Sequence, residues 1–143
     1  MRITVSVSVI MTVAIVLGLG LGLAACSKAG DGDKAAAGSA ATPRDAVLDA
    51  WRSAKLAPSA LAPATVAFSK DCQSTTVSNI DVLLCSFASP AEAKAAEPQG
   101  LAWVGAVTGA SQAHGAVLVV IADRHKADPS GRTINQLMKL APN

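Results

Sequence analysis

The stretch AVLVVIA, residues 116–122, decides the fold of this chain. It is a continuous apolar run rich in valine, which is typical of a central strand buried on both faces of a sheet. A second stretch, IDVLLCSF at residues 80–87, predicts a better-patterned strand whose side chains alternate between two faces. One face carries Ile80, Val82 and Leu84, and the other carries Leu83, Cys85 and Phe87.

Weaker strand signals flank these two stretches. Residues 65–68 predict a short strand, and residues 75–77 extend a hairpin arm toward the strand at 80–87. Residues 101–108 alternate as a third strand, and residues 109–115 form the loop after it. We therefore expect four strands that pair mainly as antiparallel hairpins.

Two of the three expected helices have clear starting signals. Thr42-Pro43 supplies an N-cap and a proline at the first helical position, ahead of an apolar stripe from Val47 to Ala54. Ser89-Pro90-Ala91-Glu92 is a capping box, and the helix that it starts ends by Glu97-Pro98. Both helices are therefore bounded by the sequence itself.

Asp128-Pro129 caps a last helix, whose apolar stripe runs from Ile134 to Ala141. The element order is then α-β-β-α-β-β-α within one globular domain, residues 43–143. This order predicts the α+β class: a small two-layer sandwich with a four-stranded sheet and helices on one face.

Such short helices are expected to leave part of the sheet uncovered. Apolar sheet surface near Trp103, Val117 or Val119 would then remain for a partner. The alternative is that the segment Pro58 to Pro63, or the first helix, folds over that face and completes the core.

The N-terminus has the pattern of an export signal. Arg2 precedes an uncharged run from Ile3 to Ala25, and the run ends in Leu23-Ala24-Ala25-Cys26. These four residues resemble the lipobox of bacterial lipoproteins. The resemblance implies a signal peptide at residues 1–25, cleavage before Cys26, and a lipid on the Cys26 thiol. The alternative is an uncleaved transmembrane helix, since about 20 apolar residues can span a bilayer.

Either interpretation places the rest of the chain outside the cytoplasm, in the cell envelope. Residues 26–42 are expected to form the lipidated N-terminus and a flexible tether of Ala, Gly and Ser. Ser27 after the lipid cysteine resembles outer-membrane retention, which applies where the host has an outer membrane. The membrane, reached through lipid at Cys26, is therefore the first expected partner.

The cysteine count agrees with this placement. Three cysteines would leave an odd thiol in an oxidising compartment. If Cys26 carries lipid, Cys72 and Cys85 remain as a pair, and a disulfide is their natural use. The alternative is two reduced, buried thiols.

Charge and composition argue against nucleic acid as a partner. The chain has 12 Lys and Arg against 10 Asp and Glu, and one of those cations, Arg2, lies in the signal peptide. It has no tyrosine and only two phenylalanines, too few for a base-stacking surface.

Residues able to do chemistry are few and scattered. His114 is expected in a loop, and Asp123 and His125 at a solvated strand end. Two such ligands do not make a metal site. Trp103, His114, Asp123 and His125 are therefore weak surface candidates, and no catalytic, metal or cofactor site is expected.

Two functional classes remain. The first is a membrane-anchored binding module of the envelope, whose partner is an envelope protein or a small ligand. The second is a small extracytoplasmic enzyme using Ser111, His114, Asp123 or His125. A deep pocket collecting both histidines would favour the enzyme, and a gently concave face would favour the module.

Overall fold

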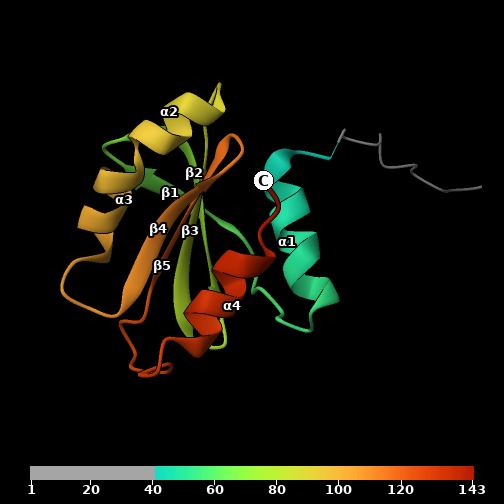
Figure 1. Cartoon of the computed structure of the whole chain (residues 1–143), viewed down its shortest axis with the longest axis vertical. Helices are drawn as coiled ribbons and strands as arrows, with labels where there is room; N and C mark the ends of the chain where they lie inside the picture. Colours follow the sequence, from blue (N-terminus) through green and yellow to red (C-terminus); the bar gives the residue numbers. More distant parts are fainter. Residues whose placement is uncertain (1–40) are drawn as a thin grey trace, which may run out of the picture. The chain divides into compact units, whose positions relative to one another are not determined.

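The fold is α+β, built on a five-stranded antiparallel sheet with four helices (Figure 1). We describe it from a computed structural model that covers residues 41–143. The proposed signal peptide, Cys26 and all but the end of the tether lie outside these residues. The elements are α1 (Pro43–Ser53), β1 (Ala62–Val66), β2 (Ser69–Val77), β3 (Ile80–Ser86), α2 (Pro90–Ala95), α3 (Glu97–Val104), β4 (Gly109–His114), β5 (Val117–Ala122) and α4 (Arg132–Leu140).

The sheet has the strand order β1-β2-β3-β5-β4, and every pair is antiparallel. All six residues of β5 are buried, which confirms the prediction of a central strand. The two-sided pattern of β3 is also confirmed, because Val82 and Leu84 join one hydrophobic cluster while Leu83 and Cys85 join the other. These two strands form the middle of the domain.

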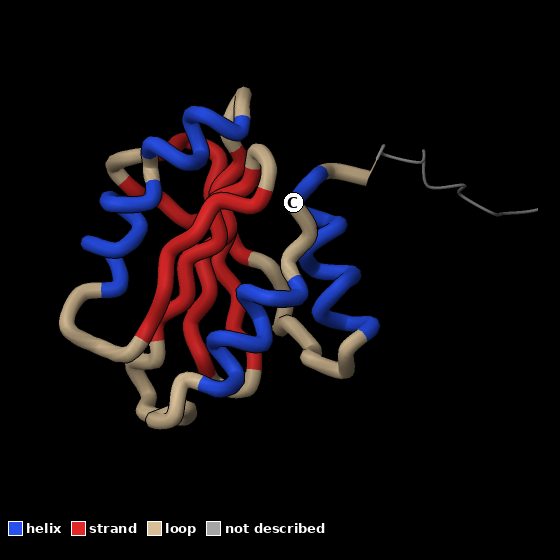
Figure 2. Tube along the Cα trace, in the orientation of Figure 1, coloured by secondary structure: helices blue, strands red, loops and turns tan. Residues whose placement is uncertain are grey.

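Helices cover both faces of the sheet, so the prediction of two layers with helices on one face is wrong. In Figure 2 the strands lie between α1 and α4 on one side and α2 and α3 on the other. Val117 and Val119 are 1% and 0% exposed beneath α1 and α4, so neither offers a free apolar surface. On the other face, the short helices α2 and α3 pack over β4 and β5.

The α1–α4 layer is held by the larger cluster. Val47, Leu48 and Trp51 form the predicted stripe on α1, and all three are buried. The Trp51 indole N–H donates to the Leu137 carbonyl oxygen at 2.8 Å, which satisfies the one polar atom of this ring. That bond also joins α1 to α4 within the core.

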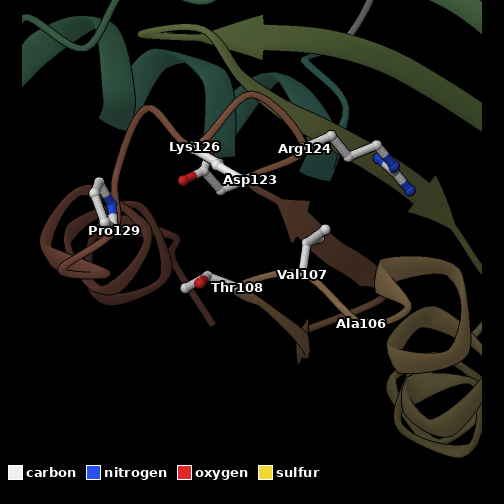
Figure 3. Close-up of a pocket in the computed structure, with 7 residues that line it drawn as sticks. All are labelled: Ala106, Val107, Thr108, Asp123, Arg124, Lys126 and Pro129. Atoms are coloured by element: carbon white, nitrogen blue, oxygen red, sulfur yellow. The ribbon is translucent and has the colours of Figure 1, made fainter.

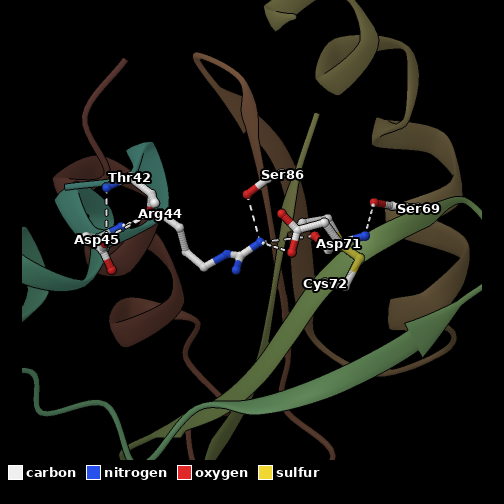
Figure 4. Close-up of polar contacts among 8 residues, drawn as sticks. Thr42, Arg44, Asp45, Ser69, Asp71, Cys72 and Ser86 are labelled. Carbon is white, nitrogen blue, oxygen red and sulfur yellow. Dashed lines mark hydrogen bonds and ion pairs between the residues drawn. A yellow bond between two sulfur atoms is a disulfide. The ribbon is translucent and has the colours of Figure 1, made fainter. Parts of the chain in front are cut away.

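The start of α1 is fixed by both local and distant contacts. Thr42 caps the helix as predicted, and Asp45 completes a capping box with it. Arg44 then reaches across to the sheet, where Nη2 donates to the Asp71 carboxylate at 2.8 Å and to the Ser86 hydroxyl at 2.7 Å (Figure 4). α1 is therefore anchored beside Cys72.

The disulfide between Cys72 and Cys85 is present, as predicted. The two residues lie directly opposite each other on β2 and β3, with their Cα atoms 4.1 Å apart. The strands themselves differ from expectation, because β1 covers Ala62–Val66 and the polar segment after it is the nine-residue strand β2. β2 is polar in sequence, but Cys72, Thr75 and Val77 are buried along it, and threonine is well suited to strands.

The first half of the predicted strand at 101–108 is instead helical, and the second half is a loop. α3 begins at Glu97 with Pro98 in its first turn, so this proline starts a second helix after the one that Ser89 caps. Gly100 is buried where α3 crosses the sheet, and a Cβ there would lie 2.9 Å from Val120 Cγ2 and would collide with Ser111 Oγ. A glycine therefore serves the close approach of helix and sheet.

The predicted loop at 109–115 is largely the edge strand β4, which takes the place of the strand predicted at 101–108. The sheet has five strands rather than four because β2 is a full strand of its own. Its residues are small and polar, but six of them pair in register with β5. The outer edge is bonded to α3: Ala113 N–H donates to Glu97 Oε1 at 2.8 Å, and the Ser111 hydroxyl donates to the Glu97 carbonyl at 2.9 Å. At the opposite edge, β1 contains Pro63 and an irregular register between Ala64 and Val66.

Candidate functional site

The candidate site lies where β5 ends and the loop toward α4 begins. A hollow of about 410 Å³ opens there between that loop and the α3–β4 loop (Figure 3). Its lining residues are Ala106, Val107, Thr108, Asp123, Arg124, Lys126 and Pro129. A second hollow of about 290 Å³ adjoins it, and Arg124 lines both.

Asp123 builds the loop and is not available to a ligand. Its side chain was expected at a solvated strand end, but the residue is 3% exposed. One carboxylate oxygen accepts the Ala127 N–H and the other accepts the Asp128 N–H, both at 2.8 Å. Because a buried carboxylate needs such donors, this residue folds the chain back on itself.

Asp128 continues the same turn into α4. Its carboxylate accepts the N–H groups of Arg132 and Ile134 and the Ser130 hydroxyl. Burial by itself raises the pKa of Asp128, but these hydrogen bonds outweigh it and hold the pKa below its usual value. The helix begins at Arg132, later than the expected Pro129, because the loop residues between them form this turn.

Arg124 is the central side chain of the site. Its guanidinium lies over the Trp103 ring, 4.0 Å from the centroid. One terminal nitrogen donates to the Trp103 carbonyl at 2.8 Å, and the other pairs with Asp81 at 3.2 Å. The Arg124 side chain is nevertheless 37% exposed, so it is oriented by the protein and still faces solvent.

The neighbours of Arg124 add charge and hydroxyl groups. His125 Nε2 lies 3.6 Å from the second oxygen of Asp81, and Lys126 is exposed with a left-handed backbone at φ 55°. The smaller hollow is lined by hydroxyl groups of Ser59, Ser74 and neighbouring threonines. The site therefore combines an oriented cation, a carboxylate and hydroxyl groups beside apolar walls.

His114 lies far from this site along the sheet. It ends β4 and pairs with Val117, whereas Asp123 and His125 follow the opposite end of β5. The expectation of a surface loop is wrong, because His114 is 5% exposed and neither ring nitrogen has a hydrogen-bond partner within residues 41–143. Burial lowers the pKa of His114, partly offset by the Ala141 backbone and the charge of Glu97.

The sequence candidates for chemistry are therefore not brought together. Ser111 is bonded to Glu97 at the sheet edge, and the two histidines occupy opposite ends of the β4–β5 hairpin. Within the part of the chain that the structure describes, no group of three or more His, Cys, Asp or Glu side chains could hold a metal ion.

Trp103, Asp123 and His125 are the sequence candidates that the structure places in or beside the site, whereas His114 lies away from it. Arg124 and Asp81 were missed, because the pairing of β3 with β5 brings them together from distant positions in the chain. A signal was present in the sequence: Asp123-Arg124-His125-Lys126 follows directly on the central strand, at the sheet end where loops meet.

No family model, curated protein or solved structure matches this chain. Among residues 41–143, no helix is long and apolar enough to cross a membrane.

Proposed function

We propose that this chain is a lipid-anchored protein of the cell envelope, and that its domain acts as a binding module through the surface around Arg124. The observation that carries the binding role is the pair of adjoining hollows that share this one oriented, partly exposed guanidinium. Binding sites typically combine a concave surface with a few well-placed polar groups.

The anchor is supported by the lipobox at Leu23-Ala24-Ala25-Cys26. A disulfide between Cys72 and Cys85 agrees with an oxidising compartment, where such bonds persist. Two or more acyl chains on Cys26 would give stable membrane attachment, whereas one chain gives only marginal binding.

The anchor is tested by mass spectrometry and fractionation of the full chain. We expect the mature protein to begin at a lipid-modified Cys26, and a Cys26→Ser variant to carry no lipid and to keep residues 1–25. Retention of Met1, or an unmodified Cys26, would contradict the lipid anchor.

The binding role is tested by co-purification of the detergent-solubilised full chain. The informative comparison is between the unmodified chain, Arg124→Glu, and the matched charge reversal Lys139→Glu on α4. We expect a companion molecule that is lost with Arg124→Glu and kept with Lys139→Glu. Equal recovery from all three chains would show that the binding surface lies elsewhere.

A further inference from the structure

We infer that the two hollows beside Arg124 bind a small amphipathic ligand with a free carboxylate, such as a short peptide or an N-acylated amino acid. The carboxylate lies at the Arg124 guanidinium, and the apolar part lies in the larger hollow. This inference rests on the proposed binding function and names the ligand class for that surface.

The guanidinium is already held in one orientation. The Trp103 ring supports its face, while the Trp103 carbonyl and Asp81 each accept one hydrogen bond. A planar fork fixed in this way loses little freedom when a carboxylate binds, so more of the interaction energy appears as affinity. Figure 3 shows Arg124 at the side of the larger hollow, with its side chain extending away from the other labelled residues. Arg124 also lines the smaller hollow.

The charges exposed at this junction favour an anion. Arg124 and Lys126 are exposed, whereas the nearest carboxylates are the partly buried Asp81 and the buried Asp123. Asp123 is occupied by two backbone N–H groups, and Lys126 forms no salt bridge within residues 41–143. An incoming carboxylate therefore meets a surface on which the accessible charges are mainly positive.

The walls indicate what the rest of the ligand looks like. Ala106, Val107 and Pro129 give the larger hollow an apolar side, and Val107 is 38% exposed there. Its volume of about 410 Å³ suits a small molecule. Across Arg124, the Ser74 hydroxyl donates to the Ala62 carbonyl at 3.4 Å, and its oxygen can still accept a hydrogen bond from an amide N–H.

A carboxylate fits this arrangement better than a phosphate does. Phosphate sites in proteins typically surround the ion with several backbone N–H groups as well as cations. Here the anion would meet one guanidinium fork and one ammonium beside apolar side chains. That setting suits a single carboxylate attached to an apolar group, which would accept from guanidinium N–H groups that Asp81 and the Trp103 carbonyl leave free.

The test titrates the detergent-solubilised full chain with N-acetyl-alanyl-valine, and in parallel with the same compound bearing a C-terminal amide. Trp103 fluorescence reports binding, because the only other tryptophan, Trp51, is fully buried in the α1–α4 core. Arg124→Gln removes the proposed anion contact. Lys139→Gln, an exposed change on α4, is the matched control.

We expect the acid to bind saturably and the amide to bind at least about tenfold more weakly than the acid. Hydrogen bonds to charged groups contribute that much affinity. Arg124→Gln should lower the affinity for the acid by a similar factor, and Lys139→Gln should leave that affinity unchanged. The inference would be overturned if the acid and the amide bound with equal affinity, or if Arg124→Gln bound the acid as tightly as the unmodified chain does. It would also be overturned if inorganic phosphate bound as tightly as the acid. If Arg124→Gln does not fold, the acid–amide comparison on the unmodified chain decides the question.

Failure to bind either compound would overturn this ligand class alone. The proposed function is tested separately, by the lipid on Cys26 and by co-purification.

Discussion

The two faces of the sheet are covered in different ways. Under α1 and α4, the large side chains are almost fully buried, and the Trp51 indole is satisfied inside the core. Under α2 and α3, the cluster is smaller, and Phe68, Phe87 and Trp103 remain partly exposed around it. The first face provides most of the stability, while the second keeps accessible surface beside the disulfide and Arg124. Truncations on the two faces should therefore have unequal effects.

The largest expected effect comes from removing Trp51, and removing Trp103 gives the matching measurement on the other face. Trp51→Ala should lower the free energy of unfolding by about 3–5 kcal/mol, because it leaves a cavity and removes the indole hydrogen bond to the Leu137 carbonyl. Trp103→Ala should cost about 1–2 kcal/mol, since the ring is only partly buried. Urea unfolding followed by circular dichroism measures both. Equal losses would contradict the difference between the faces.

The disulfide should contribute somewhat less than Trp51. Replacing Cys72 and Cys85 together by alanine should lower the free energy of unfolding by about 3 kcal/mol, because the bridge restricts a 13-residue separation in the unfolded chain. Hydrogen exchange should increase mainly in β2 and β3 and much less in α4. The unmodified chain under reducing conditions is the control and should reproduce the double variant.

Gly100→Ala tests how closely α3 packs on the sheet. Helix propensity alone favours alanine by about 1 kcal/mol, but the new methyl group would collide with Ser111 and crowd Val120. We expect a net loss of about 1–2 kcal/mol in the free energy of unfolding. Ala102→Gly, at an exposed position of the same helix, controls for propensity and should lose about 1 kcal/mol. A stabilised Gly100→Ala variant would mean that α3 moves freely over the sheet.

His114 is expected to give the smallest effect, visible in the pH dependence of stability. Its pKa is lowered from an ordinary value of 6.5, chiefly by burial, so the unfolded chain binds the proton more tightly. Its contribution to stability is therefore complete above about pH 6.5 and is lost as the pH falls below that value. In His114→Gln, the urea midpoint of unfolding should change less between pH 7 and pH 5 than it does in the unmodified chain.

Carboxylates do not confuse this measurement. The pKa values of Glu97 and Asp128 are lowered from ordinary values of 4.5 and 3.8, so their contributions are lost only in stronger acid. An unchanged slope in His114→Gln would show that burial does not hold this ring neutral.

The parts of the fold that could be predicted are those whose structure is determined by local sequence signals. The run at 116–122 is apolar on both faces, and Thr42 and Ser89 carry their capping signals locally. β4 could not be predicted in this way, because its small and polar residues become a strand only by pairing with β5. α3 was missed because Pro98 suits both the end of one helix and the first turn of the next.

The candidate site was predictable only in part, for a similar reason. Trp103 was identifiable as a large aromatic residue, but its partners depend on sheet register. Asp81 opposes Ala122 across β3 and β5, and this pairing brings it beside Arg124, 43 positions later in the chain. An antiparallel register cannot be deduced from either strand separately.

Glu97 and Pro63, at the two edges of the open sheet, have a consequence for crowding. If Cys26 carries a lipid, as proposed above, the chain diffuses in two dimensions and meets copies of itself far more often than in bulk solution. An unprotected strand would then recruit strands from its neighbours and extend into fibres. Here Glu97 occupies the N–H of Ala113 on one edge, while Pro63 lacks a donor on the other. Dense patches of this protein should therefore remain collections of separate molecules, each with its Arg124 surface free.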